Sequence, residues 1–443
     1  MIKIPRRIAQ TIINSLKGGV VPRIGLPYIA VGRRREVEAL LHDVDIVGNG
    51  GASFRFIVGK YGSGKSFLLQ TIRNHVMDRN FVVADADLSP ERRLQGNQGQ
   101  GLATYRELLR NLSVKSKPEG GALTLVLDRW ISNVQTDTAA ATGLTLDDNA
   151  FAPAVEQRIM NVIRSMQNLV HGFDFARLLS LYYRAFTEGD DELKGKVLKW
   201  FRGEYATKTE ARQELGVTVI ISDDDWYDYL KLLAYFFRQA GYAGLMVFID
   251  ELVNIYKIPN SISRQYNYEK MLTMYNDALQ GKAQYIGMVM SGTPQCVEDR
   301  HRGIYSYEAL RSRLQEGKFA QSQGVQDLMG PVLRLQPLTS EEMLVLTEKL
   351  ADIHATLYGY ERKVNDNDLA DFIKIEYGRI GADEHITPRE VIRDFIELLD
   401  ILYQNPTADL RALLQSDAFS YAKPTLDQQS DAATDSRFAE FTI

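Results

Sequence analysis

Gly59-Lys60-Tyr61-Gly62-Ser63-Gly64-Lys65-Ser66 fills the pattern G-x-x-x-x-G-K-[ST] and predicts a loop that holds the phosphates of a nucleotide. An apolar run at residues 54–58 precedes it, and residues 67–72 follow with helical spacing. Glycines in such a loop let backbone N–H groups turn toward phosphate, and the N-terminus of the next helix adds a favourable field. The flanking pattern disfavours the alternative, a chance glycine-rich turn. We therefore expect an α/β fold with a nucleotide site at the end of a strand.

The side chains of this loop have separate predicted roles. The Lys65 ammonium is expected to reach the β- and γ-phosphates, and the Ser66 hydroxyl is expected to bind Mg²⁺. Lys65 is therefore the residue whose loss should abolish nucleotide binding. The residues expected to contact the nucleotide are Gly59, Gly62, Ser63, Gly64, Lys65, Ser66 and Phe67.

Val247-Phe248-Ile249-Asp250-Glu251 is a second motif, an apolar strand that ends in two acids. Asp250 is expected to hold Mg²⁺, directly or through water, and Glu251 is expected to polarise the attacking water. Phosphoryl transfer needs this division, since metal and lysine neutralise charge while a base orients the nucleophile. An acid after a strand is common by itself, but together with the phosphate loop it indicates a nucleotide site. The long separation of the two motifs predicts a helical block inserted between strands of the sheet.

A third predicted strand, residues 285–291, leads into Ser291-Gly292-Thr293-Pro294. Thr293, or alternatively Ser291, is expected to hold the attacking water beside the γ-phosphate. A plain strand-to-loop turn is the other interpretation, because Gly-Thr-Pro makes such a turn without any catalytic role. We place Thr293 among the predicted catalytic residues.

An arginine after this strand is a candidate for charge stabilisation in the transition state. Residues 309–314 have helical spacing, and Arg313, with Arg311 as its alternative, is expected to reach the nucleotide of a neighbouring subunit. A solvated helix face or a salt bridge is the other interpretation. The first interpretation makes the protein a homo-oligomer.

Further candidates lie outside the predicted sheet. Thr387 and Pro388 predict the start of a helix, and Arg389 beside them is expected to fold onto the γ-phosphate and couple a helical lid to the nucleotide. Gly32 and Arg33, upstream of the loop, are candidates for the adenine pocket. The six histidines show no metal-ligand spacing, and no Ser/His/Asp or Cys/His arrangement supports nucleophilic catalysis.

The elements predicted along the chain give five regions. Thr339 and Glu342 form a capping-box pattern, which predicts where the C-terminal helices begin. Residues 135–152, rich in Thr, Ala, Asp and Asn, are expected to form a long loop. The apolar end, residues 438–443, is either a docking peptide or a frayed tail. The regions are 1–90, an N-terminal helix and the first part of the core; 91–240, a mostly helical insertion; 241–337, the second part of the core; 338–404, a helical lid; and 405–443, a disordered tail.

Composition and charge exclude several classes of protein. The chain is 45% apolar and 25% charged, as in globular proteins, and its net charge of −5 gives no general basic character for binding nucleic acid. Cys296 is the only cysteine, so disulfide scaffolds and cysteine metal sites are excluded. The N-terminus lacks the apolar core of a signal peptide, and no apolar run is long enough for a bilayer, which predicts a cytoplasmic protein without a membrane segment.

Several further stretches complete a set that resembles a known family. They are Leu16-Lys17-Gly18-Gly19-Val20-Val21-Pro22, Ile29-Ala30-Val31-Gly32-Arg33 and Gly241-Tyr242-Ala243-Gly244-Leu245. Together with the motifs above, they make the chain similar to AAA+ ATPases, and within these to the branch of origin-recognition and Cdc6-like proteins. A more specific resemblance, over residues 6–404, is to the ATP-binding proteins of BREX phage-defence systems, especially the shorter BrxD-like members.

This resemblance implies a P-loop AAA+ core with a parallel sheet, a large helical insertion and a C-terminal helical lid, with ATP and Mg²⁺ as ligands. It also implies an antiviral role on DNA beside a helicase, a methyltransferase and other defence proteins. Origin-recognition relatives carry a winged-helix domain after the lid, whereas only residues 405–443 remain here, which argues against direct reading of DNA sequence. The family's nucleotide residues carry over onto Gly64, Lys65, Ser66, Asp250 and Glu251.

Functions from different classes stay open at this point. One is an ATP-hydrolysing switch or motor that acts on DNA with partner proteins. Another is a signalling or scaffold module in which bound nucleotide sets a conformation and turnover is slow. Glu251 favours hydrolysis, because a protein that only binds nucleotide needs no water-polarising acid. A simple DNA-binding protein with a structural nucleotide is disfavoured by the acidic pI of about 5.8.

Overall fold

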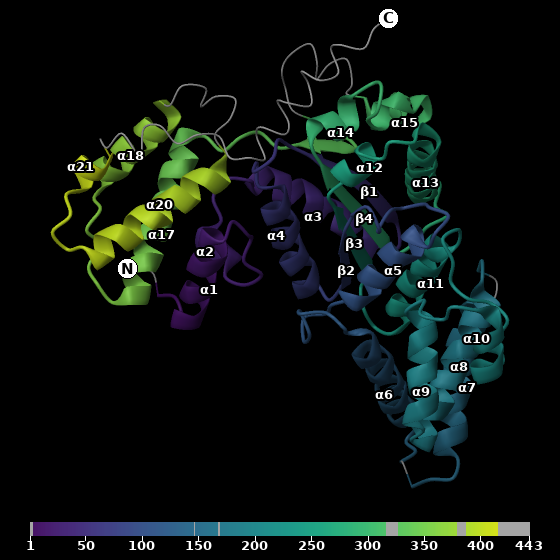
Figure 1. Ribbon diagram of the computed structural model, residues 1–443. Helices are drawn as coiled ribbons and strands as arrows, with labels where there is room; N and C mark the ends of the chain where they lie inside the picture. The colour runs from purple at the N-terminus through teal and green to yellow at the C-terminus, as the bar shows by residue number, and fades with distance from the viewer. Residues whose placement is uncertain (1–2, 146, 167–168, 316–326, 379–386, 415–443) are drawn as a thin grey trace, which may run out of the picture. The chain divides into compact units, whose positions relative to one another are not determined.

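A parallel sheet forms the core of the molecule. The computed structural model describes residues 3–145, 147–166, 169–315, 327–378 and 387–414. In this part of the chain, five strands form one all-parallel sheet in the order β2-β3-β4-β1-β5 (Figure 1), which confirms the predicted α/β class. The strands are almost entirely buried, as expected when helices cover both faces. They are β1 (Ala52–Val58), β2 (Val82–Asp87), β3 (Leu245–Asp250), β4 (Ile286–Gly292) and β5 (Val332–Arg334).

The chain folds into two compact units. The first, called here the lid unit, comprises residues 1–34, 60–70 and 335–443, and the second, the sheet unit, comprises residues 35–59 and 71–334. Each unit has its own cluster of buried apolar side chains. The division falls inside the predicted phosphate loop, between residues 59 and 60, and again inside the helix that follows it.

The sheet unit packs helices against individual strands. α11 lies against β3, α5 against β2, and α13 against β1. Arg55 of β1 and Asp43 of α3 form a buried ion pair with an Nε–Oδ2 distance of 2.5 Å, which fastens α3 to the strand that leads into the phosphate loop. The helices of this unit after α3 (Arg34–Gly48) are α5 (Gln100–Arg110), α6 (Leu123–Thr142), α7 (Phe151–Met166), α8 (Gly172–Glu188), α9 (Asp191–Phe201), α10 (Lys208–Leu215), α11 (Trp226–Gln239), α12 (Val253–Tyr256), α13 (Ser261–Leu279), α14 (Pro294–Glu298), η1 (Ile304–Ser306) and α15 (Glu308–Leu314).

Helices α5–α11 lie between β2 and β3 in the chain, where the sequence predicts mostly helical structure (Figure 1). The loop predicted at residues 135–152 is shorter than expected, because α6 continues to Thr142 and α7 already begins at Phe151. The threonines of α6 satisfy their hydroxyls inside the helix, since Thr138 Oγ1 donates to Val134 O at 2.7 Å and Thr142 Oγ1 to Thr138 O at 2.7 Å. Such bonds let a threonine-rich stretch remain helical despite a composition typical of loops.

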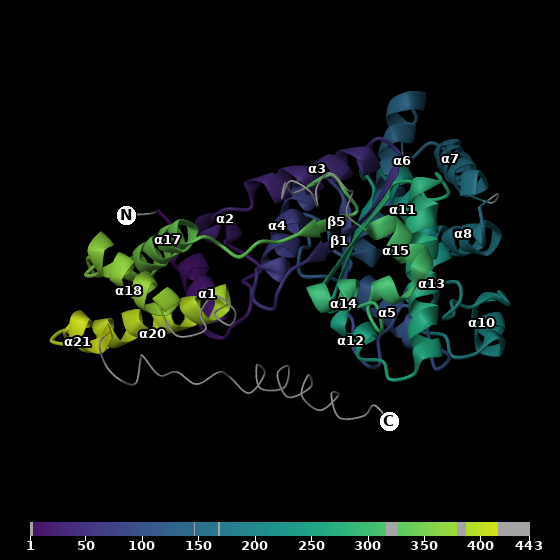
Figure 2. The same cartoon turned by 90° about the horizontal axis from the view of Figure 1, so that it is seen from above.

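The lid unit is built from helices at both ends of the chain. α1 (Arg6–Lys17), the predicted N-terminal helix, packs against α17 and α20 (Figure 2). Both α17 and α20 begin with a complete capping box, from Thr339 and Thr387, which confirms the two predicted helix starts. The remaining helices of this unit are α2 (Leu26–Ile29), α17 (Ser340–Tyr358), α18 (Asp366–Gly378), α20 (Pro388–Gln404) and α21 (Leu410–Leu414).

A polar network joins α1, α17 and α20. Lys17 Nζ lies 2.5 Å from Asp400 Oδ2, and the buried His354 ring contacts Asp400 Oδ1 at 3.1 Å and the Tyr360 hydroxyl at 2.7 Å. Burial lowers the pKa of the His354 imidazole. Desolvation would raise the pKa of Asp400, but hydrogen bonds from Lys17 and His354 outweigh it and lower that pKa. The network therefore holds a neutral histidine and an ionised aspartate, and it ties the N-terminal helix to the C-terminal ones.

The predicted tail, residues 405–443, includes the short helix α21. Residues 415–443 lie outside the described residues, so the docking peptide at 438–443 and the boundaries of the five regions stay predictions. None of the helices in the described ranges has the length and apolar character that crossing a bilayer requires.

Candidate functional site

The phosphate loop connects β1 to α4 (Lys65–Asp78), in the strand–loop–helix order that the sequence predicts. Gly62 and Gly64 have φ angles of +74° and +91°, in the left-handed region that glycine tolerates best. Ser63 between them does not adopt positive φ, and such alternation of handedness makes a concave run of backbone N–H groups that binds anions. The Gly64 carbonyl accepts a hydrogen bond from Leu68 N at 2.9 Å, so the loop runs straight into the first turn of α4.

The side chains of Lys65 and Ser63 lie close to the loop backbone. Lys65 Nζ donates to Lys60 O at 3.0 Å, which keeps the ammonium against the loop backbone. The Ser63 side chain is buried, and its hydroxyl has no hydrogen-bond partner in the described part of the chain. A Cβ built at Gly64 would meet no atom within 4 Å, so this side of the loop is open. A cation beside an open run of glycine backbone is the arrangement that the predicted phosphate site calls for.

Arg33 braces the loop from within the lid unit. Its Nη2 donates to Ser63 O at 3.0 Å and to Gln336 O at 2.6 Å. The backbone of Gly32 and Arg33 is also in the left-handed region, with φ of +64° and +61°. A Cβ at Gly32 would lie 2.4 Å from Glu342 Oε1, so a larger residue would have to displace this carboxylate as well as adopt positive φ. The guanidinium thus holds the loop backbone, a contact that the sequence did not predict, and the adenine role stays a prediction.

Arg389 and Thr387 also reach the loop within the lid unit. Arg389 Nη1 donates to the Tyr61 hydroxyl at 2.7 Å, and its guanidinium carbon lies 4.9 Å from the centre of the Tyr61 ring. A Cβ at Gly62 would lie 2.4 Å from Thr387 Cβ, so the N-terminus of α20 packs directly on this glycine. The structure therefore brings the predicted lid arginine to the loop through Tyr61, a residue that the sequence did not single out.

Phe67 packs with the apolar cluster of the lid unit, and its ring is partly buried there. Gly59, on the other side of the division, donates its N–H to Gly292 O of β4 at 3.2 Å. Packing alone explains the apolar side chain at Phe67, and Gly59 continues the ladder between β1 and β4. Their predicted nucleotide contacts stay predictions.

The second motif forms the acidic end of β3 in the sheet unit. Ser291 Oγ, fully buried on the neighbouring strand β4, donates a short hydrogen bond to Asp250 Oδ1, and Glu251 N donates to the same oxygen at 2.8 Å. Glu251 has φ of +64°, a conformation that is uncommon for a residue with a side chain, and it is exposed. Backbone strain of this kind persists only where the surrounding structure imposes it, and it gathers at functional sites.

Asp87 is an acid that the sequence analysis missed. It ends β2 and pairs with Asp250 in the register of the parallel strands. Desolvation, followed by the charges of Asp250 and Asp85, raises the pKa of Asp87. The signal was present, because β2 ends in two acids at alternate positions, but without the strand order nothing placed it beside Asp250. Neighbouring carboxylates that repel one another favour a cation between them.

Thr293 and Arg313 have other contacts in the sheet unit. Thr293 Oγ1 lies 3.0 Å from Cys296 Sγ, whereas the alternative, Ser291, is the residue that bonds Asp250. Arg313 is exposed on α15, and its Nη1 donates to Ala309 O of the same helix at 2.7 Å, while Arg311 lies 3.5 Å from Glu308. The roles predicted for Thr293 and Arg313 stay predictions.

No group of three or more His, Cys, Asp or Glu side chains that would bind a metal by themselves occurs in the described ranges. The Mg²⁺ site that the motifs predict is of another kind, in which one or two protein ligands are completed by phosphate oxygens and water. Ser66 and Asp250 are the predicted protein ligands, and their oxygens are of the hard type that Mg²⁺ prefers.

One family of known proteins matches this chain. The family described as BREX system ATP-binding protein BrxC/D matches residues 4–418, which is nearly the whole of the described chain. No curated protein matches. The chain therefore belongs to the BrxC/D family of BREX ATP-binding proteins, and the predicted resemblance to BREX ATP-binding proteins is confirmed.

Proposed function

We propose that this member of the BrxC/D family is a Mg²⁺-dependent ATPase whose nucleotide state controls how it works with other BREX components. Hydrolysis, as distinct from binding, rests on one observation, the acidic end of β3. There the Asp250 carboxylate accepts hydrogen bonds from the Ser291 hydroxyl and from the Glu251 N–H. Glu251 is exposed, and its backbone has a left-handed conformation. A protein that only stores nucleotide has no need of a strained, exposed carboxylate at this place.

The phosphate loop supplies the binding energy in this proposal. The N–H groups around Gly62 and Gly64 hold phosphate oxygens, and Lys65 neutralises charge on the β- and γ-phosphates. Lys65 then exchanges its bond to the Lys60 carbonyl for phosphate oxygens, which are stronger acceptors because they are charged.

Asp250 and Ser66 would hold Mg²⁺, which when bound neutralises the charge that develops on the transferring phosphoryl group. Ser291 holds the carboxylate of Asp250 in one rotamer, so the metal would meet a ligand that is already oriented. Glu251 accepts a hydrogen bond from the attacking water and orients it. Asp87, paired in register with Asp250, adds negative charge that favours the cation.

Replacement of Glu251 by glutamine tests hydrolysis directly. Glu251→Gln keeps the size of the side chain but cannot polarise water, so ATP should remain bound while steady-state phosphate release falls by about two to four orders of magnitude. Glu188→Gln, an exposed change on α8, is the matched control and should leave the rate unchanged. Unchanged turnover in Glu251→Gln would remove Glu251 from the mechanism.

Action on DNA is part of the proposal and is measured in the same assay. Phosphate release by the purified wild-type protein, with duplex DNA, single-stranded DNA or neither, should rise with one of the two nucleic acids. A rate of phosphate release that neither nucleic acid changes would indicate that the protein acts through its BREX partners.

A switch with slow turnover is the second candidate, and one observation favours it. Within the lid unit, Arg33 and Arg389 both contact the phosphate loop, directly or through Tyr61, so a change in the loop passes to α20 and to the N-terminal segment. Nucleotide binding with turnover far below one per minute, with or without DNA, would favour this candidate over the motor.

A homo-oligomer with Arg313 as a finger has its own test. Arg313→Ala and Lys65→Ala subunits, each inactive alone, should regain part of the activity when mixed, because one intact site then forms between chains. No recovery of activity in a sample shown to oligomerise would argue that Arg313 acts within its own subunit.

A further inference from the structure

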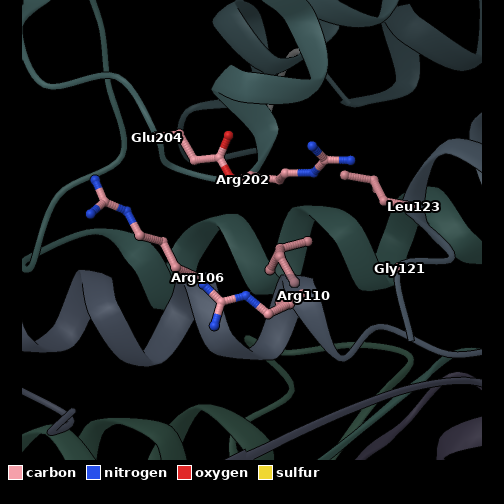
Figure 3. A pocket seen from close by; sticks show the side chains of 7 residues that line it. Arg106, Arg110, Gly121, Leu123, Arg202 and Glu204 are labelled. Carbon is pink, nitrogen blue, oxygen red and sulfur yellow. The ribbon is translucent and has the colours of Figure 1, made fainter. Parts of the chain in front are cut away.

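A cavity of about 480 Å³ opens in the sheet unit, where α5, the start of α6 and the segment after α9 meet (Figure 3). None of the sequence motifs lies in it. Its residues are Arg106, Leu109, Arg110, Gly121, Leu123, Arg202 and Glu204. Three arginines against one glutamate give this cavity a positive lining in a protein whose net charge is −5.

Two hydrogen bonds fix the walls of the cavity. The Tyr105 hydroxyl donates to Phe201 O at 2.7 Å, and Arg106 Nε donates to Gly203 O at 2.8 Å. Gly203 has φ of +69°, and a Cβ there would lie 2.8 Å from Leu102 Cδ1. The backbone of the segment that carries Arg202 and Glu204 is therefore held on α5 by these two hydrogen bonds.

The guanidinium groups keep donors available. Arg106 uses only Nε for Gly203, and its terminal nitrogens have no hydrogen-bond partner in the described residues. The Arg202 side chain makes no hydrogen bond or ion pair within the same residues. Figure 3 shows Arg106 and Arg110 on one helix and Arg202 with Glu204 on the opposite wall. Arg110 is exposed and pairs with Glu107 of its own helix at 2.9 Å, so it is bound only loosely.

We propose that this cavity binds the phosphate of a ligand other than the nucleotide at the phosphate loop. Planar guanidinium groups with free N–H donors match phosphate oxygens, and Figure 3 shows them spread along the cavity. The volume suits a nucleotide-sized molecule, and Leu109 and Leu123 offer it an apolar surface. A free phosphorylated molecule and a phosphate of a nucleic-acid strand share this chemistry, and they differ in length.

The test uses the full-length protein with Lys65→Ala, so that the phosphate loop contributes little binding. Pyrophosphate is titrated by calorimetry, and a fluorescein-labelled single-stranded 12-mer is followed by fluorescence anisotropy. Arg202→Gln is the main variant because its side chain makes no described hydrogen bond, so folding should not depend on it. Arg184→Gln, an exposed arginine of α8, removes the same charge elsewhere and is the matched control.

Arg202→Gln should weaken pyrophosphate binding roughly tenfold relative to Arg184→Gln, as expected for the loss of one charge-assisted contact. A loss confined to pyrophosphate identifies a free small ligand, and an equal loss for the 12-mer identifies the phosphates of a strand. Arg202→Lys should recover only part of the affinity, because the ammonium lacks the planar fork. Equal affinities in Arg202→Gln and Arg184→Gln, or no binding of either probe, would overturn the proposal. Because the readout is the difference between these variants, it does not depend on whether the protein hydrolyses ATP.

Discussion

The phosphate loop, residues 59–66, and the cavity lined by Arg106, Arg110 and Arg202, called here the arginine cavity, are proposed to hold phosphate by different means, and they are encoded differently in the sequence. The loop consists of eight consecutive residues, and its donors are backbone N–H groups positioned by glycines. The cavity draws side chains from three separated segments, at residues 106–110, 121–123 and 202–204. The first can be recognised in a short stretch of sequence, whereas the second exists only after α5, α6 and α9 have packed. The comparison predicts that changes in the two regions act independently and through different chemistry.

Lys65→Ala should have the largest effect and should separate the two regions. The change removes the ammonium that faces the phosphates, so ATP affinity should fall by on the order of a hundredfold, as for the loss of several charge-assisted contacts. Pyrophosphate bound in the arginine cavity should be unaffected. Calorimetric titration of both ligands measures the two effects. Lys60→Ala is the matched control, because Lys60 contributes its carbonyl to Lys65 and that carbonyl remains. Full ATP affinity in Lys65→Ala would disprove the loop assignment.

A pair of glycine substitutions tests how the loop is built. Gly62 and Gly64 both have positive φ, so alanine at either costs roughly 1–2 kcal/mol in backbone strain. At Gly62 the new Cβ would also meet Thr387 at 2.4 Å, whereas at Gly64 it would meet nothing within 4 Å. Gly62→Ala should therefore lower the melting temperature several degrees more than Gly64→Ala, at about 2–4 °C per kcal/mol. Equal falls in melting temperature would show that α20 moves away from residue 62 without loss of stability.

Much of the fold follows from local patterns in the sequence. The strands β3 and β4 are apolar runs, and the helices α1, α17 and α20 carry amphipathic spacing or complete capping boxes, so all five were predicted. The prediction of a loop at residues 135–152 failed over residues 135–142, where composition typical of a loop belongs to a helix whose threonines bond their own backbone. Composition reports the average preference of a residue, and it says nothing about a hydrogen bond that a particular helix supplies.

The site was predictable as far as its parts are local. Lys65 and Asp250 stand in motifs that can be read from a few residues, but their roles depend on tests still to be made. Asp87 and Tyr61 were missed for a common reason. Asp87 gains its meaning from the order of the strands, and Tyr61 from a helix that begins more than three hundred residues later in the chain. Neither relation is expressed in neighbouring residues, and the arginine cavity was missed in the same way.

Gly203→Ala applies the glycine test to the arginine cavity. Gly203 and Gly189 have nearly the same φ, +69° and +68°, so alanine imposes the same backbone strain at both. Only at Gly203 does the new Cβ approach another side chain, Leu102 at 2.8 Å. Leu102 Cδ1 ends a flexible side chain and can turn aside, but the Tyr105 ring at 3.3 Å is held by its hydroxyl. The segment should therefore shift and weaken the bond from Arg106 to the Gly203 carbonyl. Pyrophosphate affinity should then fall about threefold to tenfold, the value of one hydrogen bond. Gly189→Ala should leave it unchanged. A fall of the same size in Gly189→Ala would mean that general destabilisation, and not the cavity wall, governs binding.

Tyr61 is the loop residue that contacts Arg389, far away in the chain. Its substitution should have the smallest of the predicted effects on ligand affinity. The ring and the hydroxyl each hold Arg389, and both contacts are exposed. Tyr61→Phe removes only the hydrogen bond, so ATP affinity should fall about twofold, while Tyr61→Ala removes the ring as well and should cost about fivefold, at the lower end of the values for such contacts. Arg389→Ala, measured beside them, sets the upper limit, because Tyr61 acts through that guanidinium.

If Arg389→Ala weakens ATP binding but Tyr61→Ala does not, the arginine reaches the nucleotide without help from the ring. If Tyr61→Ala is the more damaging of the two, the ring has a role of its own in the loop. The ordered series, with Tyr61→Phe mildest and Arg389→Ala most severe, would show that a distant helix completes a site which the eight consecutive residues only begin.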